Sequence, residues 1–316
     1  MSDQFLVCDL SVRSQVSFAL AESGRPLGLT QKYACASSSE FEQCVTACLR
    51  ENGNPGVKGV ALASRGWEVN GVVQSVEGDL CISRHEVRAI LGIQRVNIVN
   101  NFVARALAMP GLRRTERAKI SGVEGSGGEN VIAVLGPHYG LGAASLVSDG
   151  GGGWTALPGE GGHSDLAAKS DREWEIISAL VAALGYASRE TALSLQGVAN
   201  IWHALHALDG KACQNLSPVE IIEKSKSGDP LAMEAMRMIA VWLGAFASDL
   251  ALIMGARGGI YLTGALIDLM GDNFDTKAFL DRFVDKGPRQ GYVSEIPVYR
   301  TLASDLELRG LATLFD

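Results

Sequence analysis

The sequence predicts an α/β protein made of two similar domains. Its 316 residues are enough for two domains of ordinary size, each with its own core. A pattern of strand, polar turn and strand occurs at residues 5–20 and returns at residues 130–147, and each copy opens a unit of roughly a hundred residues. With 47% apolar and 20% charged residues, the composition is that of an ordinary soluble protein. The repeated pattern therefore indicates duplicated α/β domains.

The first half of the chain is expected to alternate strands with helices. Its strands are short apolar runs bounded by polar residues, and its helices carry apolar residues on one face. Ser83 stands at the N-cap of the second helix, with Glu86 at the capping-box position and Gly92 after its end. The expected elements are strands at 5–10, 16–20, 57–63 and 96–99, and helices at 38–52, 83–91 and 103–109.

The second half is expected to follow the same plan after a connector at residues 111–129. This connector has four basic residues and five glycines and is expected to be the least ordered stretch of the chain. The expected elements are strands at 130–135, 143–147, 260–262 and 297–299, and helices at 171–184, 194–208 and 230–255. The first of these helices is expected to bury one apolar stripe, made of Trp174, Ile177, Leu180, Val181 and Leu184.

Charge and composition argue against several classes of partner. A formal charge of −7 disfavours nucleic acid and anionic membranes, since both bind basic surfaces. No apolar run approaches the length needed to cross a bilayer, and residues 1–10 lack a signal-peptide pattern, so a cytoplasmic protein is expected. The six cysteines lack metal-finger spacing, and Cys44 and Cys48 are expected to be buried thiols. His203 and His206 lie one helical turn apart without further ligands, so no metal site is expected.

The stretch richest in polar chemistry is the segment at residues 157–166. A proline and three glycines predict an irregular loop that is neither helix nor strand. Glycine permits close approach of a ligand to the backbone, and Glu160, His163 and Asp165 supply acceptors and donors for neighbouring hydroxyl groups. This set of groups suits a small polyhydroxylated molecule. The alternative is a glycine-rich surface turn whose charged residues are merely solvated.

These residues also carry a family resemblance. The sequence Pro-Gly-Glu-Gly-Gly-His-x-Asp at residues 158–165 resembles the sugar-binding loop of bacterial glucokinases, which belong to the hexokinase–actin ATPase superfamily. The resemblance covers almost the whole chain and implies two similar actin/hexokinase-like (ribonuclease H-like) lobes with a central cleft. It implies a small α/β lobe at 1–110 plus 301–316 and a large α/β lobe at 111–300 that carries the sugar loop. By the same resemblance, residues 306–315 form the helix with which the chain returns to the small lobe.

The resemblance implies four contacts to a bound sugar. Glu160 and His163 come from the sugar loop, Glu190 matches a second carboxylate of the family, and Asn100 matches an asparagine that holds sugar hydroxyls. The ligand implied is glucose or a related hexose. A homodimer is also implied, and the apolar helix at 230–255 is consistent with one.

The position of the family's catalytic base differs in this chain. In the family the base is an aspartate directly after the sugar-binding asparagine, whereas here the residue is Asn101. A neutral amide cannot take a proton from the attacking hydroxyl. General-base catalysis is usually worth about 10²–10⁴ in rate, so this change alone predicts a slow enzyme.

The two phosphate loops of the family are altered as well. In the first loop, residues 10–15 after Asp9 contain no glycine, although a cradle of backbone amides needs glycine for its left-handed turns. In the second loop, residues 136–142, His138 replaces a glycine and Tyr139 replaces a threonine. The residues that the resemblance leaves on the nucleotide side are Gly140, Gly142, Gly258, Gly259 and Gly264.

Together these features predict a glucokinase-like hexose-binding protein, a sugar sensor or regulator whose ATP- and Mg²⁺-dependent phosphorylation of the hexose at its 6-position is lost or weak. One alternative is a functional ATP-dependent glucokinase with an atypical nucleotide site, in which solvent or Asp165 replaces the base and Arg13 replaces loop amides. The other is a structural or interaction protein in which the sugar loop is a relic. Nucleotide affinity distinguishes the first alternative, and failure of any hexose to raise the melting temperature would favour the second.

Overall fold

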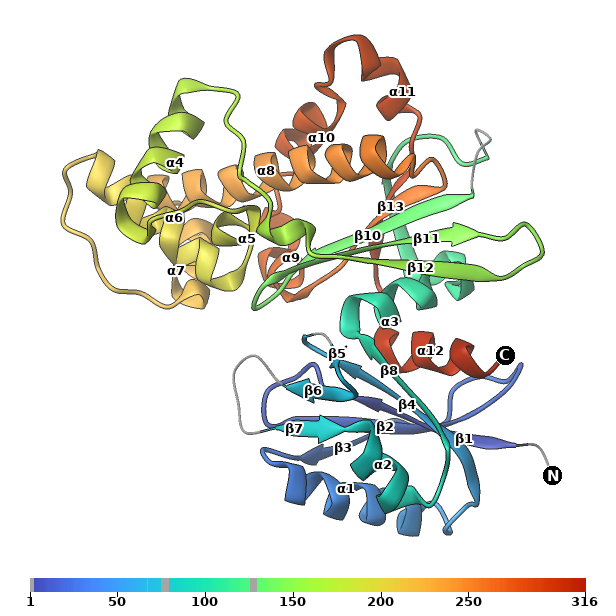
Figure 1. Ribbon diagram of the computed structural model, residues 1–316. Coiled ribbons are helices and arrows are strands. Elements are labelled where there is room, and N and C mark those ends of the chain that lie inside the picture. Colours follow the sequence, from blue (N-terminus) through green and yellow to red (C-terminus); the bar gives the residue numbers. More distant parts are fainter. Residues whose placement is uncertain (1–2, 67, 75–79, 126–129) are drawn as a thin grey trace. The chain divides into compact units, whose positions relative to one another are not determined.

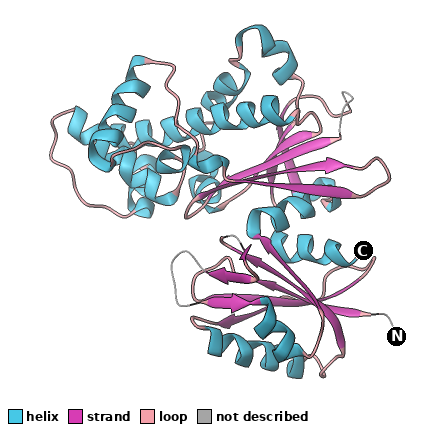
Figure 2. Cartoon of the chain, viewed as in Figure 1, coloured by secondary structure: helices cyan, strands magenta, loops and turns pink. Residues whose placement is uncertain are grey.

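The computed structural model describes residues 3–66, 68–74, 80–125 and 130–316. It divides into two compact units, unit 1 (Met1–Arg113 with Ala303–Asp316) and unit 2 (Arg114–Leu302). The expected small lobe, 1–110 plus 301–316, ends three residues earlier at the first boundary and begins two residues earlier at the second. Each unit combines one mixed sheet with helices, so the α/β class predicted from the sequence is confirmed (Figures 1 and 2).

Unit 1 is built on a five-stranded sheet in the order β3-β2-β1-β4-β8. The strand pairs β1–β2 and β2–β3 are antiparallel, and β1–β4 and β4–β8 are parallel. The elements are β1 (Gln4–Asp9), β2 (Gln15–Glu22), β3 (Gln31–Ala34), α1 (Ser38–Glu51), β4 (Val57–Ser64), α2 (Arg84–Leu91), β8 (Arg95–Asn100), α3 (Asn101–Ala108) and α12 (Leu306–Ala312). Strand β3 and a small sheet of β5 (Glu68–Val69), β6 (Val72–Gln74) and β7 (Cys81–Ser83) were not expected from the sequence.

Strand β1 reads as a continuous apolar run because both of its faces are covered. Leu6 and Cys8 belong to a core cluster that includes residues of α1 and α2, whereas Phe5 and Val7 belong to a cluster with residues of α3 and α12. Successive side chains of a strand point to opposite faces, so one short run supplies both layers. Helices therefore cover the two faces of this sheet.

Local signals in unit 1 explain the helix boundaries. Ser83 caps α2 and exchanges hydrogen bonds with Glu86, so the predicted capping box is confirmed, and Gly92 ends the helix in the left-handed conformation. Gly310 allows α12 to lie directly against α3, because a Cβ there would collide with the carbonyl oxygen of Ala104. Helices α3 and α12, which are far apart in the sequence, therefore pack side by side (Figure 1).

Unit 2 contains a six-stranded sheet in the order β12-β11-β10-β13-β14-β9. Its strands are β9 (Arg117–Ser121), β10 (Val131–Pro137), β11 (Leu141–Ser148), β12 (Trp154–Gly159), β13 (Gly259–Leu262) and β14 (Val298–Thr301). The expectation that 111–129 is a poorly ordered connector is wrong for residues 117–121, and residues 126–129 lie outside the described residues. Arg117 pairs with Thr301 in the sheet, and its guanidinium lies 4.4 Å from the ring centroid of Tyr299, a contact that local sequence cannot reveal.

The helices of unit 2 surround the long helix α8. They are α4 (Asp171–Leu184), α5 (Arg189–Ala192), α6 (Leu195–Leu208), α7 (Pro218–Lys226), α8 (Pro230–Met254), α9 (Ala265–Met270), α10 (Thr276–Val284) and α11 (Gln290–Ser294). Among the described residues, α8 alone is long and apolar enough to cross a membrane, contrary to the expectation that no run approaches that length. More than half of its most apolar stretch is buried, and it contacts α6, α7, α10 and β10, as a core helix does.

The predicted apolar stripe of α4 is only partly correct. Ile177 and Leu180 are buried, but Trp174, Val181 and Leu184 are exposed by 65%, 44% and 44%. The buried face is rotated because Glu173 occupies an inward position. Its carboxylate accepts from both terminal nitrogens of Arg282, at 3.1 and 3.0 Å, and so is stable in the interior.

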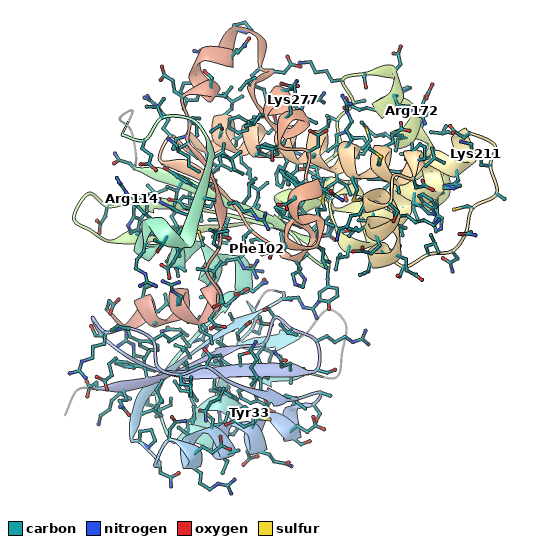
Figure 3. The ribbon with its side chains drawn as sticks, turned by 180° about the vertical axis from the view of Figure 1, so that it is seen from behind. Tyr33, Phe102, Arg114, Arg172, Lys211 and Lys277 are labelled. Atoms are coloured by element: carbon teal, nitrogen blue, oxygen red, sulfur yellow. The ribbon has the colours of Figure 1, made fainter. Side chains whose placement is uncertain are left out.

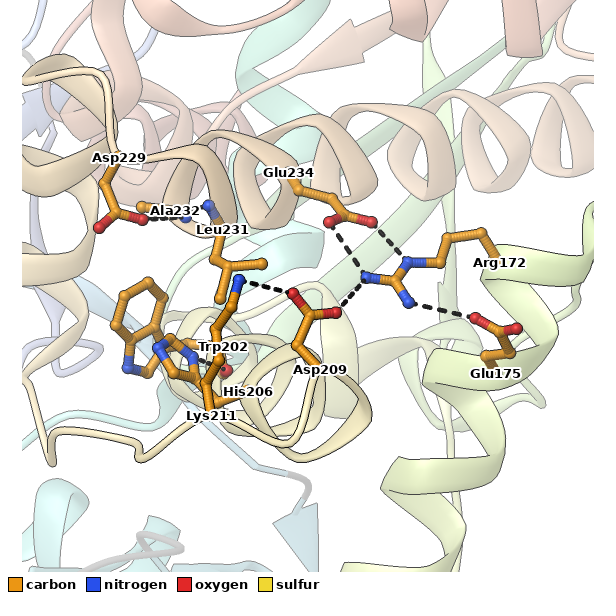
Figure 4. Close-up of polar contacts among 10 residues, drawn as sticks. All are labelled: Arg172, Glu175, Trp202, His206, Asp209, Lys211, Asp229, Leu231, Ala232 and Glu234. Atoms are coloured by element: carbon orange, nitrogen blue, oxygen red, sulfur yellow. Dashed lines mark hydrogen bonds and ion pairs between the residues drawn. The ribbon is translucent and has the colours of Figure 1, made fainter.

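A polar network joins the outer ends of the helices around α8 (Figure 4). Arg172 donates to Glu234 of α8 at 2.7 Å and to Asp209, which follows α6, at 3.5 Å. Lys211 donates to the same Asp209, and this bond lowers the pKa of the Asp209 carboxyl group. Arg172 and Lys211 both lie at the outer surface of this helical region in Figure 3, where ion pairs are individually weak.

Of the histidines and cysteines noted in the sequence, His206, Cys44 and Cys48 are buried, whereas His203 is exposed. His206 is buried with Nδ1 2.9 Å from the carbonyl oxygen of Trp202. Cys44 and Cys48 are buried free thiols, whereas Cys81 and Cys213 are exposed free thiols. Among the described residues, no group of three His, Cys, Asp or Glu side chains is placed to hold a metal ion.

Candidate functional site

The glycine-rich segment of unit 2 begins as a strand and ends as a short helical turn. Leu157–Gly159 belongs to β12, so the expectation of an irregular loop over the whole of 157–166 is wrong at its start. The 3₁₀ turn Gly161–His163 follows, and the His163 N–H donates to the Glu160 carbonyl at 3.0 Å. The turn leaves the side chains of Glu160 and His163 exposed.

The glycines of this turn are required by its neighbours in the fold. A Cβ on Gly162 would collide with the carbonyl oxygen of Leu141, and one on Gly161 would lie 3.2 Å from the Phe246 ring. The backbone of the turn therefore rests directly on β11 and α8. This packing holds Glu160 and His163 on a rigid support.

Glu190 reaches the same region from α5, which begins just after the capping residue Ser188. Two main-chain bonds fasten this short helix to the glycine-rich segment at 157–166: the Arg189 N–H donates to the Ser164 carbonyl at 2.9 Å, and the Leu166 N–H donates to the Ala187 carbonyl at 3.0 Å. Segments about 25 residues apart in the chain thus form one backbone framework.

The structure brings Glu190 and His163 together. The Oε1 atom of Glu190 lies 4.0 Å from His163 Nε2, and its Oε2 atom accepts from the Leu141 N–H at 2.7 Å. The Glu190 side chain is 32% exposed and that of His163 is 61% exposed. A carboxylate and an imidazole at this spacing, both open to solvent, can accept from and donate to neighbouring hydroxyl groups of one small ligand.

Arg189 anchors the other side of α5. Its guanidinium donates to Asp249 of α8 at 2.8 Å and lies 4.5 Å from the ring centroid of Phe246, and Lys286 pairs with the same carboxylate. Burial lowers the pKa of Arg189, opposed by the charge of Asp249. These anchors could not be predicted, because nothing in the local sequence indicates that Asp249 of the apolar helix α8 faces α5.

The asparagine predicted to contact the sugar, Asn100, and the one at the family's base position, Asn101, lie in unit 1. Asn100 ends β8 and caps α3: its Oδ1 accepts from the Phe102 N–H at 2.8 Å, and its Nδ2 donates to the Gly66 carbonyl at 3.3 Å. Asn101 is the first residue of α3. Asn100 therefore has a structural role as the cap of α3. Its contact with a sugar stays a prediction, as does the place of Asn101 at the base position.

Asp9 ends β1 in a charged cluster that local sequence does not predict. Its carboxylate accepts from the Ser11 N–H at 2.8 Å. Burial raises the pKa of Asp9 to about 6, as does the negative charge of Glu307, while the bonds to Ser11 and the charge of Arg105 oppose the rise. Arg105 of α3 donates to Glu307 of α12 at 2.9 Å.

The turn after Asp9 is an ordinary chain reversal. The Gln15 N–H donates to the Val12 carbonyl at 3.3 Å, and Ser14 takes the left-handed conformation with φ 54°. The Leu10 N–H donates to the Ala63 carbonyl at 2.9 Å and the Ser11 N–H donates to Asp9, so the first two amides after Asp9 already have partners within the protein.

The second turn, between β10 and β11, is held by main-chain hydrogen bonds, one within the turn and one from Leu195. The His138 N–H donates to the Gly140 carbonyl at 2.7 Å, and the Leu195 N–H donates to the His138 carbonyl at 2.8 Å. Gly142 pairs with Gly136 in the register of the two strands. Tyr139, at the tip, is 49% exposed.

The three later glycines predicted on the nucleotide side have packing roles. Gly259 and Gly264 have φ values of 133° and 113°, which disfavour any other residue. A Cβ on Gly264 would collide with the Pro137 carbonyl, and one on Gly259 would lie 3.1 Å from the Tyr299 ring. Gly258 donates its N–H to β10 at 2.8 Å. Whether these residues bind a nucleotide stays a prediction.

Comparison with known proteins gives a consistent result. The family model described as Glucokinase matches residues 13–316. A glucokinase-like protein of Caulobacter vibrioides is 37% identical over 283 residues, which cover 89% of this chain and 87% of that protein. A glucokinase of Aromatoleum aromaticum is 35% identical over 302 residues, covering 95% and 91%. The crystal structure of a glucokinase from an Antarctic psychrotroph is similar with a TM-score of 0.88 at 26% identity, covering 100% of this chain and 99% of that one.

Proposed function

Because the chain belongs to the glucokinase family, we propose that it binds glucose or a related hexose. Glu160, His163 and Glu190 are the proposed ligands in unit 2, and Asn100 is the proposed ligand in unit 1. The observation that carries the proposal is the pair of Glu190 and His163, 4.0 Å apart on a framework of main-chain bonds. The carboxylates would accept hydrogen bonds from sugar hydroxyls, and the imidazole would donate or accept one.

We further propose that phosphorylation of the bound hexose is slow or lost. Asn101 stands where the family has its base, and an amide cannot accept the proton of the attacking hydroxyl. ATP with Mg²⁺ would need backbone donors at the two turns, but the N–H groups of Ser11, His138 and Leu141 already donate within the protein. These turns fit a triphosphate poorly, and the proposed role is sugar sensing.

A working ATP-dependent glucokinase is the second candidate. It is favoured by the relatives that carry the name glucokinase, such as that of Aromatoleum aromaticum at 35% identity. The proposed setting in both cases is the cytoplasm, and a homodimer stays a prediction. The negative charge of −7 favours neither nucleic acid nor an anionic membrane as a partner.

Hexose binding is tested by titrating glucose into the protein in a calorimeter. We expect saturable binding, and we expect Glu160→Ala to weaken it at least tenfold, since a hydrogen bond to a charged group is worth about 1.5–3 kcal/mol. Asp272→Ala, which removes an exposed carboxylate from another turn of the same unit, is the matched control and should bind as the parent does. Equal affinity of the parent and Glu160→Ala would contradict the proposed site.

Phosphorylation is tested by a coupled assay with Mg²⁺–ATP at high protein concentration, with Asn101→Asp measured beside the parent. Activity that appears only in Asn101→Asp would mean that the base alone was missing. No turnover in either protein would leave a hexose-binding role. Turnover of the parent at ordinary kinase rates, about 1–100 per second, would establish the second candidate and overturn the first.

A further inference from the structure

Gly140 leaves the space that the Glu190 carboxylate occupies. A Cβ built on Gly140 would lie 2.5 Å from Glu190 Oε2 and 3.1 Å from its carboxyl carbon. In the same place Oε2 accepts from the N–H of Leu141, the next residue, at 2.7 Å. Leu141 is only 5% exposed, so its amide depends on this carboxylate for a partner. The missing side chain and the amide together make a seat for one carboxylate oxygen.

The backbone that carries Glu190 cannot shift to keep this contact. Helix α5 is fastened to the sugar loop by Arg189 and Leu166 main-chain bonds and to α8 by the ion pair of Arg189 with Asp249. Its first turn is closed by the exchange between Ser188 and Thr191, both buried. If the seat is blocked, the carboxylate must rotate away while the helix stays in place.

The other oxygen of Glu190 faces His163 at 4.0 Å. With Oε2 held by Leu141, the carboxylate plane is fixed and Oε1 is presented toward the imidazole and the solvent. We propose that Gly140 and the Leu141 amide are positioning groups of the hexose site, which hold Glu190 in the orientation that binds the sugar. This inference rests on the proposed hexose binding, and it assigns Gly140 to the hexose site in place of the phosphate loop expected from the sequence.

Gly140→Ala tests this inference with little damage to the fold. Unlike the neighbours of Gly162, which are backbone atoms, the atom in the way is the far end of a flexible side chain. The φ of Gly140 is not positive, so alanine is compatible with its backbone. We expect the melting temperature to fall by only a few degrees, since the Leu141 amide loses its partner, and the affinity for glucose, measured by calorimetry, to fall about 10- to 100-fold. Gly291→Ala, where a Cβ meets open space in α11, is the control and should bind as the parent does.

Glu190→Asp provides the second background. Aspartate is one methylene shorter and withdraws the carboxylate from Gly140, so Gly140→Ala should reduce glucose affinity less than twofold when added to Glu190→Asp. Equal losses in the two backgrounds, or an unchanged affinity in the single variant Gly140→Ala, would overturn the inference. If Gly140→Ala alone fails to fold, the double variant should restore folding, and failure to do so would also overturn it.

The parent protein separates this inference from the function on which it rests. A parent that binds no hexose would overturn the proposed function and the positioning role together. A parent that binds glucose beside an equally tight Gly140→Ala would overturn the positioning role alone.

Discussion

Asp9 offers a direct test of the charged cluster in unit 1. Its pKa is raised from the ordinary 3.8 to about 6, because burial and the negative charge of Glu307 disfavour its ionised form. Between these two pH values the folded protein holds a proton that the unfolded chain releases. The free energy of unfolding therefore falls as the pH rises through this range, and the ionised Asp9 lowers stability above about pH 6.

The magnitude follows from the two pKa values. The interval from 3.8 to about 6, at about 1.4 kcal/mol per pH unit, corresponds to at most about 3 kcal/mol at pH 7. Asp9→Asn removes the ionisation and keeps an oxygen that can accept from the Ser11 N–H. We expect this variant to unfold at higher urea concentration than the parent at pH 7 to 8, and at nearly the same concentration at pH 4.

The assay is urea denaturation of both proteins at several values between pH 4 and pH 8. The difference in unfolding free energy between Asp9→Asn and the parent should grow with pH. Asp3→Asn, which changes an exposed carboxylate just before the same strand, is the control and should give a flat difference. A flat difference for Asp9→Asn, or one that shrinks as the pH rises, would refute the account of the cluster.

Three further predictions concern single contacts. Glu173→Ala leaves the guanidinium of Arg282 buried without its bidentate partner, so the free energy of unfolding in urea should fall by about 3–5 kcal/mol; a loss below about 1 kcal/mol would contradict a buried pair. Ser83→Ala removes the cap of α2 and should lower the unfolding free energy by about 1 kcal/mol, with no change in glucose affinity by calorimetry. Gly162→Ala drives a Cβ into the Leu141 carbonyl, which cannot rotate away, so both thermal stability and glucose binding should be lost; normal binding would show that the turn is not held as described.

Several features of the protein could be predicted from local sequence. The continuous apolar run of β1 and the capping box of α2 could be predicted because each depends on neighbours in the chain. The proline, glycine and polar residues at 158–165 identified the candidate sugar loop for the same reason, and the family was recognised from them. The structures that such short-range patterns form depend on residues close together in the chain, so the sequence is enough to predict them.

Tertiary contacts decided the rest. Strand β9 forms because β14 pairs with it, and α4 turns Trp174 outward because Glu173 meets Arg282 from a helix more than a hundred residues later. Gly140 is part of a glycine pattern in the sequence, but only the fold places the Glu190 carboxylate in the space that its missing side chain leaves. The sequence by itself determined which residues could form strands, caps and polar loops. Long-range packing determined which buried charges have partners, because the residues around a charge do not indicate a partner that is far away in the chain.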